Sequence, residues 1–555
     1  MRVAVAFVLL GGSLALAFAA DIGNVTVSWI GNSFPHGGGK GVPYKWVPQD
    51  ASDLFVAPDG TVYTNVFWEE GGGNQTAIKD GDVLAQARGS RGWGHEGGEC
   101  VTANSKYLYY AQVYDNEGGG LKDPNNWPPK GSKWFGVSRR NRTDIRTGDP
   151  FQGGKGGKES PKGCFLPVHE AAKDGDITGL HATDEELFVA SAFDDTVRVY
   201  DANTMALKRK WTAEKPRRLF MDRDGALWVI HGEGTRIGRF DQEGRKLPQT
   251  VQLNAPSEAS DLCIDKDNRL LVADAGPENV VRVYEDIGKA PRETRTIGTP
   301  GGIFAGTPGR FGDLRFHRIA GVGTDDAGNV YVASTQQPSS GLIVESYSPT
   351  LKLNWRAMAL EFVDRIAEDP GDHTSLFSKE TRYTFDASKP AGQEWTYRGL
   401  TLHPRKYPHD PRLTLRLCSP FVQRIEGKPF LFLNGQNDAN PLAIYRFDEQ
   451  TDGEIAIPCG LINKNRKSSG RIPGEPAQGE YLWIDANGDG QFQADEFATQ
   501  GGKEGPWAGG VWIDTQGAIW FACGGSLRRF DCQGLNGKGA PKYDFEHVES
   551  FPCPA

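Results

Sequence analysis

Beyond its first 20 positions the sequence contains no apolar run of 18 residues, so no membrane-spanning helix is expected in the mature chain. It also lacks an excess of basic residues, because 62 Lys and Arg stand against 71 Asp and Glu, for a net charge of -9. Duplex nucleic acid is therefore not expected as a partner. A chain of 24% charged residues without long apolar runs is typical of an ordinary globular protein.

Several motifs that carry chemistry are also missing. The sequence has no G-x-S-x-G nucleophile elbow, no H-E-x-x-H metalloprotease pair and no P-loop. It has no C-x-x-C and no C-x-x-C-H, so it signals neither a dithiol redox pair, nor a zinc ribbon, nor a c-type haem. The common signatures of hydrolases and nucleotide-binding proteins are therefore missing. Function has to be inferred from the fold and from the residues of its loops.

The first 20 residues have the composition of a secretory signal peptide. Arg2 supplies the positive charge, an apolar stretch follows, and Ala17-Phe18-Ala19 is a small-x-small cleavage site before Asp21. We therefore expect a secreted or periplasmic protein. Eight cysteines in an exported chain predict disulfides, although Cys263 lies inside an apolar strand pattern and is expected to be a free core thiol.

Glycine is abundant, at 71 of 555 residues against roughly 7% in an average protein. That much glycine disfavours a helical protein and favours many tight turns. A unit recurs that consists of a short strand, a turn with Asp, Asn or Gly, and a strongly apolar strand. Its clearest copies are Leu54–Tyr63, Leu219–Ile230, Leu262–Ala273, Val322–Ala333 and Val511–Ala522, and weaker copies are Val101–Val113, Leu180–Ala190 and Phe421–Leu433.

A third strand often follows the unit and ends in an aromatic and an acidic residue, as in Val197–Asp201 and Val281–Glu285. Where no insertion intervenes, the units are 40–45 residues apart, which is the length of a propeller blade. The pattern D-x-x-G-x-[VL]-[YW]-V-A followed by [YF]-[DE] resembles NHL-type repeats and the related propellers of the senescence-marker-protein and gluconolactonase superfamily. This resemblance implies an all-β fold, a β-propeller of eight four-stranded blades, with seven as the alternative.

We expect one propeller domain over residues 21–555, with insertions at about 116–175, 355–415 and 465–505. The second insertion contains a helical pattern from Trp355 to Glu368. It also contains a basic stretch, His403–Arg412, which is either a solvated loop over the propeller edge or a lid or partner surface.

The third insertion carries the strongest chemical motif. Residues 485–496 fit D-x-[DN]-x-[DN]-G-x5-E, the calcium loop of EF-hands, at every position. Oxygen ligands for calcium are expected from Asp485, Asn487, Asp489, Gln491 and Glu496, with Gln493 at the position that often binds through water. The preceding residues Tyr481–Ile484 read as a strand rather than a helix, so a structural Ca2+ is favoured over a sensor.

The resemblance to propellers also selects candidate ligand residues. In such propellers, the loops that enter each inner strand and those that follow each second strand gather on one face around the channel. Ligand-binding candidates on these loops are Glu69, Glu96, Arg217, Asp261 and Asp274, and weak catalytic candidates are His95, Tyr114, His231, His317 and Arg318.

Three functions remain open for this chain. The first is a non-catalytic module that binds a polysaccharide or a protein on the channel face, where Trp68, Trp93, Trp127 and Trp507 offer stacking surfaces. The second is a metal-dependent lactonase- or esterase-like hydrolase, for which Asp261, Asp274, Glu233 and Asn434 are the nearest ligands. The third is a polysaccharide lyase that uses a His or Tyr as base and a cation to neutralise a uronate carboxylate.

Overall fold

The computed structural model describes most of the chain after residue 46. The described residues are 21–22, 25–26, 47–68, 74–87, 95–118, 128–156, 163–170, 174–335, 341–359, 365–390, 393–415, 417–435, 439–464 and 472–553. They form a multi-blade β-propeller built from nine antiparallel sheets, together with one two-stranded pair, β1 (Asp21–Ile22) and β2 (Val25–Thr26). Within these described ranges, helical structure is limited to α1 (Pro411–Thr414) and the 3-10 turns η1 (Gly302–Phe304) and η2 (Ala494–Glu496).

Six consecutive sheets make up the first part of the structure, called the ring below. The first contains β3 (Asp53–Val56), β4 (Val62–Asn65), β5 (Gln75–Lys79) and β6 (Asp82–Gln86), and the second contains β7 (His95–Glu96), β8 (Val101–Ala103), β9 (Tyr107–Asp115), β10 (Lys133–Asn141) and β11 (Phe165–His169). The third contains β12 (Gly179–Ala182), β13 (Glu186–Ser191), β14 (Thr196–Asp201) and β15 (Leu207–Thr212), and the fourth contains β16 (Leu219–Met221), β17 (Leu227–His231), β18 (Arg236–Phe240) and β19 (Lys246–Gln252). The fifth contains β20 (Ala259–Ile264), β21 (Leu270–Asp274), β22 (Val280–Glu285) and β23 (Arg292–Ile297), and the sixth contains β24 (Ile319–Thr324), β25 (Val330–Ser334), β26 (Ile343–Tyr347) and β27 (Leu353–Met358).

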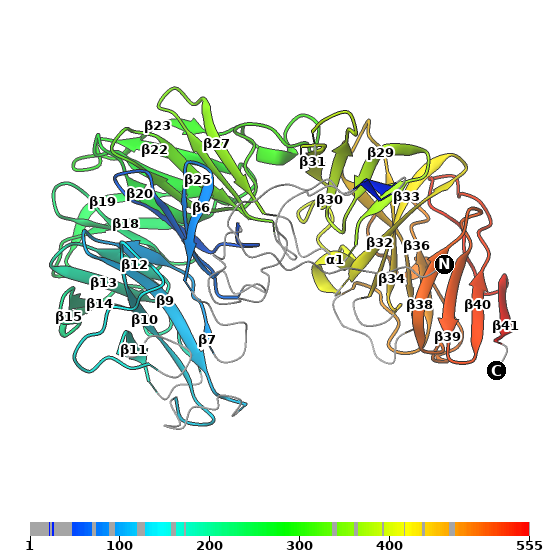
Figure 1. Cartoon of the computed structure of the whole chain (residues 1–555), viewed down its shortest axis with the longest axis horizontal. Coiled ribbons are helices and arrows are strands. Elements are labelled where there is room, and N and C mark those ends of the chain that lie inside the picture. The colour runs from blue at the N-terminus through cyan, green and yellow to red at the C-terminus, as the bar shows by residue number, and fades with distance from the viewer. Residues whose placement is uncertain are drawn as a thin grey trace.

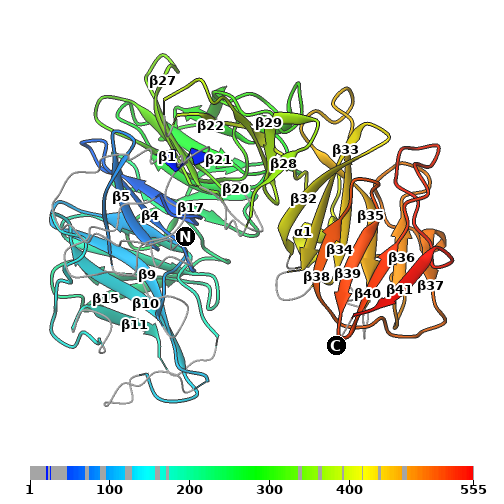
Figure 2. The same ribbon diagram turned by 45° about the vertical axis from the view of Figure 1, so that its right-hand side comes forward.

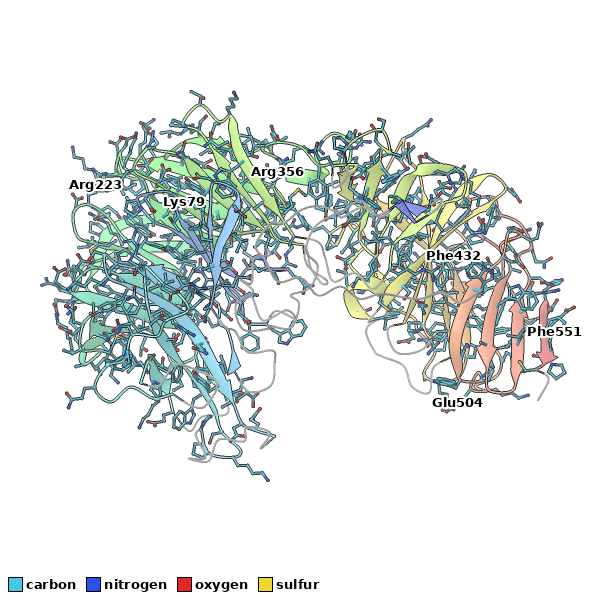
Figure 3. The ribbon with its side chains drawn as sticks, viewed as in Figure 1. Lys79, Arg223, Arg356, Phe432, Glu504 and Phe551 are labelled. Carbon is cyan, nitrogen blue, oxygen red and sulfur yellow. The ribbon has the colours of Figure 1, made fainter. Side chains whose placement is uncertain are left out.

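Three further sheets lie beside the ring and are called the second group (Figures 1 and 2). The first contains β28 (Ala367–Asp369), β29 (Asp372–Phe377), β30 (Thr381–Phe385) and β31 (Trp395–Leu400). The next has six strands, β32 (Leu417–Ile425), β33 (Lys428–Gly435), β34 (Leu442–Phe447), β35 (Ala456–Asn463), β36 (Tyr481–Ile484) and β37 (Phe497–Thr499), and the last contains β38 (Ala508–Ile513), β39 (Ile519–Cys523), β40 (Ser526–Phe530) and β41 (Val548–Pro552). Figure 3 shows Phe432 inside this group and Phe551 on its last strand, in agreement with their burial and exposure.

The recurring sequence unit is a hairpin whose turn is held by its first aspartate. Asp222 Oδ1 accepts hydrogen bonds from the amides of Asp224 and Ala226, and its Oδ2 accepts one from Trp228 Nε1 at 3.1 Å. Asp514 accepts from Trp520 Nε1 in the same way, at 2.8 Å. The turn thus requires an aspartate, a small residue four positions later and a tryptophan six positions later, like Asp222, Ala226 and Trp228. This fixed spacing explains why the sequence motif recurs. All eight predicted units coincide with paired first and second strands.

The ring closes between its last and its first sheet. The inner strands contact one another in the order β3, β8, β12, β16, β20, β24, and β24 returns to β3. Leu54 and Val56 of β3 lie so close to β24 that a Cβ on Gly323 would be 2.3 Å from Val56 Cγ2. The described contacts therefore go round six sheets, so the expected counts of eight and seven blades are not confirmed. The single domain expected over residues 21–555 stays a prediction.

A loop between β23 and β24, residues 298–318, joins the ring to the second group and is called the bridging loop. Leu400 donates its amide to the carbonyl of Gly309 at 2.8 Å, and Glu454 donates its amide to Pro308 at 2.9 Å. Ile303 and Phe304 of this loop pack with Leu400 and Leu402 in one apolar cluster. The segment after β31 is thereby held against the ring.

Two sequence expectations were wrong. The predicted helix from Trp355 to Glu368 is not present, because Trp355 belongs to β27 and Glu368 to β28, while residues 360–364 lie outside the described residues. Apolar spacing in this stretch fits a helix, yet Trp355 and Ala357 pair across the sheet with Ser346 and Val344. The expected disulfides are also absent, since all eight cysteines lie in described segments and all are free. Cys263 is a buried core thiol, as expected. Among the described residues, no helix has the length and apolarity that crossing a membrane requires.

Candidate functional site

A pocket of about 500 Å³ lies at one mouth of the ring's channel and is called the mouth pocket. Its walls come from residues next to inner strands, including Asp50, Glu99, Arg217 and His317. The second group contributes Pro404 and Arg405, from the segment that follows β31. The pocket is thus built by the ring and completed by the second group.

The mouth pocket is lined by arginines that include Arg217, Arg318 and Arg405. The guanidinium of Arg217 is half-buried and makes no hydrogen bond or ion pair with the described residues. Arg405 Nη2 donates to the carbonyl oxygen of Ala275 at 2.8 Å. Burial lowers the pKa of Arg405, and Arg318 nearby lowers it further while Glu258 acts against this. The charge of Glu258 has a larger effect on this pKa than that of Arg318, so Arg405 lies near an acid as well as near another arginine.

Arg318 itself has a strained backbone. Its φ is 43°, in the left-handed region that non-glycine residues rarely adopt. Asn279 Oδ1 accepts the Arg318 amide at 2.7 Å and holds this conformation. Strained residues of this kind cluster at binding and catalytic sites, and Arg318 is one of the residues that line the pocket.

His317 is the least satisfied polar group of the pocket. The side chain is buried, and neither ring nitrogen has a hydrogen-bond partner among the described residues. Burial lowers the pKa of His317 to about 3, with smaller contributions from Arg318 and Arg405, so the ring is neutral at physiological pH. Phe304 packs edge-on against it at 5.2 Å and stacks on His403 at 3.8 Å between ring centroids. A neutral imidazole can donate one hydrogen bond and accept another, and here both remain available.

The lining also carries acids. Glu99 and Glu258 are exposed carboxylates of the lining, and Asp50 Oδ1 accepts hydrogen bonds from the Ala51 amide and from the Thr335 hydroxyl. Burial raises the pKa of Asp50. Glu258 raises the pKa of Arg405 and Arg318 lowers that of Asp50, so acidic and basic side chains of the lining lie near one another.

Below the mouth, the channel is filled by a buried group of one arginine and two aspartates. Arg218 Nε lies 3.4 Å from Asp53 Oδ1, and its Nη2 donates to the carbonyl oxygens of Ser52 and Glu99. Asp53 accepts the Val101 amide and Asp261 accepts the Val322 amide, so each joins its own sheet to another. Burial raises the pKa of Asp53 to about 6, and it raises the pKa of Asp261 well above its ordinary value with help from the Asp53 charge.

The structure brings some of the predicted site residues together and separates others. Arg217, His317 and Arg318 line the mouth pocket, and Asp261 lies deeper in the channel. The remaining candidates with described side chains are structural: Asp274 pairs with Arg282 at 2.8 Å, Tyr114 packs edge-on against Phe165 at 4.6 Å, and buried His231 packs against Phe240. Glu69 lies outside the described residues, and of His95 and Glu96 only the backbone, in β7, is described.

The four residues considered for a lactonase-like metal do not meet. Asp274 is occupied by Arg282, Glu233 is exposed and paired with Lys215, and Asn434 belongs to β33 in the second group. Sequence reasoning did not select Arg405, Asp50, Thr335 or Phe304. Arg405 was within the basic stretch noted as a lid or partner surface, but its place in the pocket depends on how the second group packs on the ring.

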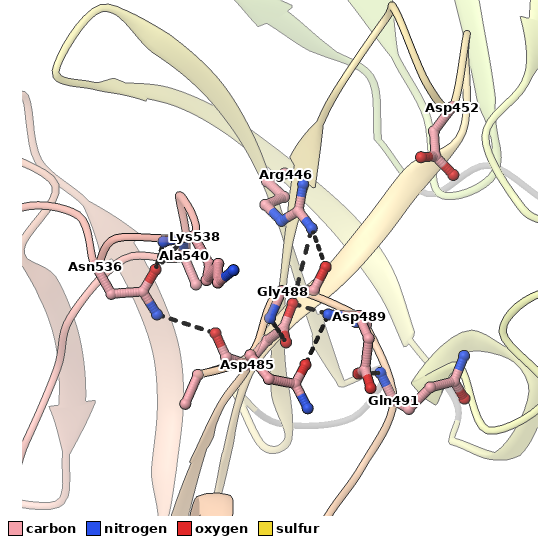
Figure 4. A network of polar contacts seen from close by, with 12 residues as sticks. Arg446, Asp452, Asp485, Gly488, Asp489, Gln491, Asn536, Lys538 and Ala540 are labelled. Carbon is pink, nitrogen blue, oxygen red and sulfur yellow. Dashed lines mark hydrogen bonds and ion pairs between the residues drawn. The ribbon is translucent and has the colours of Figure 1, made fainter.

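Residues 485–496, which match the EF-hand calcium motif, follow β36 and form a closed turn that ends in η2 (Figure 4). Asp485 is fully buried, and its carboxylate accepts the amides of Gly488 at 2.8 Å and Gly490 at 3.2 Å. Asn487 Oδ1 accepts the Asp489 amide, and Glu496 Oε1 accepts the Ala486 amide, both at 2.8 Å. Burial raises the pKa of Asp485. The candidate oxygens thus come from a single tight turn.

Neighbouring segments hold this turn in place. Asn536 Nδ2 donates to the Asp485 carbonyl at 2.9 Å, and Arg446 Nη2 donates to the Gly488 carbonyl at 2.8 Å. Gln491 Nε2 reaches the carbonyl of Lys406 at 2.8 Å, next to the pocket residue Arg405. Gln493 Oε1, at the ninth position of the motif, is buried and has no partner among the described residues. Nowhere in the described residues do three or more His, Cys, Asp or Glu side chains form a ready metal cluster.

Comparison with known proteins gives no family. No protein-family model matches the chain, and none of the curated proteins matches it. Among solved structures, the chain is similar to a protein of unknown function from Bacteroides caccae, with 13% identity and a TM-score of 0.35 over 55% of this chain and 93% of that one. It is similar to virginiamycin B lyase from Staphylococcus aureus, with 11% identity and a TM-score of 0.35 over 65% of this chain and 99% of that one. A streptogramin B lyase matches with 12% identity and a TM-score of 0.32, over 53% and 91%.

Proposed function

We propose that this chain is an exported binding protein that takes a glycan or a segment of another protein into the mouth pocket. The observation that carries the proposal is His317, a buried side chain in a pocket of about 500 Å³ whose two ring nitrogens lack a partner among the described residues. Leaving such a group unsatisfied is costly, and a bound ligand removes the cost. The pocket volume is within the usual range for ligand sites. Assignment of the blades to the NHL-type and gluconolactonase-like propellers is part of the same proposal.

Binding is favoured over catalysis by the residues that surround His317. The described lining offers no tyrosine to act with His317 as an acid–base pair, and Tyr114 and His231 are packed elsewhere. A lyase would need such a pair to remove one proton and deliver another. The ligands considered for a metal-dependent hydrolase are separated, as described above.

The test is a glycan and peptide array probed with the wild type and with Arg217→Glu. Arg217 has no partner in the described residues, so reversing its charge leaves the fold intact while altering the pocket. The matched control is Arg223→Glu, an exposed arginine in a hairpin turn away from the pocket. We expect ligands that bind the wild type and the control to lose affinity for Arg217→Glu. Equal binding by all three proteins, or no binding at all, would contradict the proposal.

We further propose that residues 485–496 bind one Ca2+ as a structural ion. Carboxylate and amide oxygens at positions 1, 3, 5 and 12 of the loop are the donors that calcium prefers, and the orphaned Gln493 Oε1 is at position 9. Two glycines with positive φ, Gly488 at 85° and Gly490 at 70°, give the turn its shape. The bound ion would fix the loop that supports Lys406 and, through it, the segment carrying Arg405.

Calorimetry on metal-stripped protein tests the calcium proposal. The wild type should bind one equivalent, Asp485→Ala should bind none, and Asp495→Ala should bind like the wild type because Asp495 is exposed at a non-ligand position. Added calcium should raise the Tm of the wild type and of Asp495→Ala, and it should leave the Tm of Asp485→Ala unchanged. Unchanged stoichiometry in Asp485→Ala would show that the ion, if any, is elsewhere.

A further inference from the structure

One buried arginine of the ring has no acidic partner in the part of the chain that the structure describes. Among the described residues, seven arginine side chains are buried. Six of them form an ion pair: Arg139 with Asp149, Arg218 with Asp53, Arg239 with Asp222, Arg382 with Glu454, Arg412 with Asp410 and Arg528 with Glu480. The seventh is Arg140, which is 2% exposed. The one hydrogen bond of its guanidinium group to a described residue runs from Nη2 to Gln75 Oε1 at 3.5 Å, and its Nε has no partner among them.

Arg139, the residue before Arg140 in β10, shows what a buried guanidinium requires in this sheet. It is also 2% exposed, and its Nη2 donates to Asp149 Oδ1 at 3.0 Å. Its Nη1 donates to two carbonyl oxygens that follow β14 in the third sheet. Because successive side chains of a strand point to opposite faces, Arg140 faces the first sheet, where Gln75 lies. A buried charge without a counter-charge is costly, so the interior between the first two sheets needs a negative charge that no described side chain supplies.

A second donor without a described partner lies next to Arg140 on the same face of the sheet. Tyr110 of β9 pairs with Ser138 of β10, two residues before Arg140, so the Tyr110 and Arg140 side chains are diagonal neighbours. Tyr110 is fully buried, and its hydroxyl group has no hydrogen-bond partner among the described residues. Gln112 Oε1, an acceptor on this face that also has no partner there, lies two residues further from Arg140 along β9.

The titratable groups that act on Arg140 are two phenols and a thiol. Burial lowers the pKa of Arg140, and the groups that act against this are Tyr114, Tyr110 and Cys164. Burial raises the pKa of Cys164 to about 11 and that of Tyr110 well above its ordinary value, so neither is negatively charged at neutral pH. An arginine keeps its charge in proteins. A bound anion would supply the charge that the described residues lack.

We propose that Arg140 and Tyr110 hold a small monovalent anion, of the size and charge of chloride, between the first and second sheets of the ring. One guanidinium charge calls for one negative charge, and the Nε–H and the phenolic O–H both donate hydrogen bonds to it. The ion is small because Leu108 and Tyr110 pack directly against Tyr63 and Ala77 of the first sheet. The bound ion joins these two sheets, and the inference is independent of the binding function proposed for the mouth pocket.

Urea unfolding in sodium chloride and in sodium gluconate, at one ionic strength, tests the proposal with the wild type, Arg140→Met and Arg146→Met. Arg146 is the matched control, since its side chain is 61% exposed and pairs with Asp144 on the surface. Gluconate is too large for the site, so it replaces chloride without binding there. Above the dissociation constant, a tenfold rise in chloride should raise the folded-to-unfolded ratio of the wild type and of Arg146→Met about tenfold, which is about 1.4 kcal/mol. Arg140→Met should show no such rise, and an equal rise in all three proteins, or none in any, would overturn the proposal.

A second variant and a direct observation test the proposal even where Arg140→Met does not fold. Tyr110→Phe keeps the buried ring and loses one donor, so it should need roughly tenfold more chloride for the same stabilisation. In crystals of the wild type grown with sodium bromide, anomalous scattering should place a bromide within hydrogen-bonding distance of Arg140 Nε and Tyr110 Oη. A water molecule at that position, or bromide at the surface alone, would show that the guanidinium is compensated by hydration and that the inference is wrong.

Discussion

Replacement of Glu454 by glutamine should loosen the attachment of the second group to the ring. Glu454 is buried, with 1% of its surface exposed, and its carboxylate accepts hydrogen bonds from three arginines. Oε1 accepts from Arg310 Nε at 2.7 Å and from Arg398 Nε at 3.0 Å, and Oε2 accepts from Arg382 Nη1 at 3.2 Å. Arg310 belongs to the bridging loop, whereas the other two belong to the second group, so this carboxylate joins the two parts.

The expected magnitude follows from what glutamine leaves behind. The amide keeps one acceptor oxygen but loses the charge. Arg382 is buried, and among the described residues Ser375 and Glu449 are its remaining hydrogen-bond partners. Breaking a buried ion pair costs about 3–5 kcal/mol, and the remaining acceptors reduce this to about 3 kcal/mol. That energy corresponds to a roughly 150-fold increase in the equilibrium for opening the junction.

Hydrogen exchange followed by mass spectrometry reads this junction directly. A peptide covering residues 398–402 contains the amide of Leu400, which donates to Gly309, and one covering residues 305–312 contains the amide of Phe311, which donates to Arg398. In Glu454→Gln these peptides should exchange roughly 100-fold faster, because opening limits their exchange. The control is Glu449→Gln. Glu449 pairs with Arg382 and Arg398 from a side chain that is 59% exposed, and its replacement should change exchange by less than about fivefold. Equal rates in the two variants would refute the claim that the buried carboxylate holds the junction.

Two further predictions concern the ring. Gly323→Ala should lower the free energy of unfolding by about 1–3 kcal/mol, because its Cβ would overlap Val56, whereas Gly510→Ala has an open site and should be within about 0.5 kcal/mol of wild type in guanidinium titrations. Asp261→Asn should be more stable than wild type at pH 7. The raised pKa of Asp261 means that the folded state binds more protons than the unfolded state above about pH 4, so wild-type stability falls as the pH rises from there toward the folded pKa. The advantage of the variant should therefore vanish below pH 4, and an advantage independent of pH would contradict this reasoning.

The hairpins could be predicted from the sequence because their determinants are local. The aspartate of each turn and the aromatic of the next strand interact within about six residues, as Asp222 and Trp228 do, and the motif records that spacing. The sheet β28–β31 was missed because its turns depart from the D-x-x-G spacing of the repeat. Asp369 accepts the Gly371 amide at 2.9 Å, but this glycine is two residues after the aspartate rather than three, and the turn at Lys379-Glu380 has no aspartate. Apolar spacing alone then favoured a helix at Trp355, where cross-strand pairing to Ser346 decides the structure.

Local sequence patterns could not predict the number of sheets in the ring or the full set of residues that line the pocket. Closure depends on β24 and β3, which are more than 250 residues apart, and on glycines at Gly321 and Gly323 that let the two strands approach. The choice of Arg217, His317 and Arg318 rested on their positions before inner strands, which is a local property. Arg405 has no such position, and it enters the pocket because Phe304 of the bridging loop stacks on His403 two residues before it.

The same contact gives the junction a role in binding. Phe304 contacts His317 on one side and His403 on the other, so it lies between a ring residue and a second-group residue of the same pocket. Behind the segment, Tyr407 packs with Ile455 and Ile457, and Gln491 of the calcium motif donates to the Lys406 carbonyl. Loosening the junction at Glu454 or the turn at Asp485 would therefore move Arg405 relative to Arg318 without touching either arginine. Such movement raises the cost of ordering the site when a ligand binds, so ligand affinity and junction stability are expected to fall together.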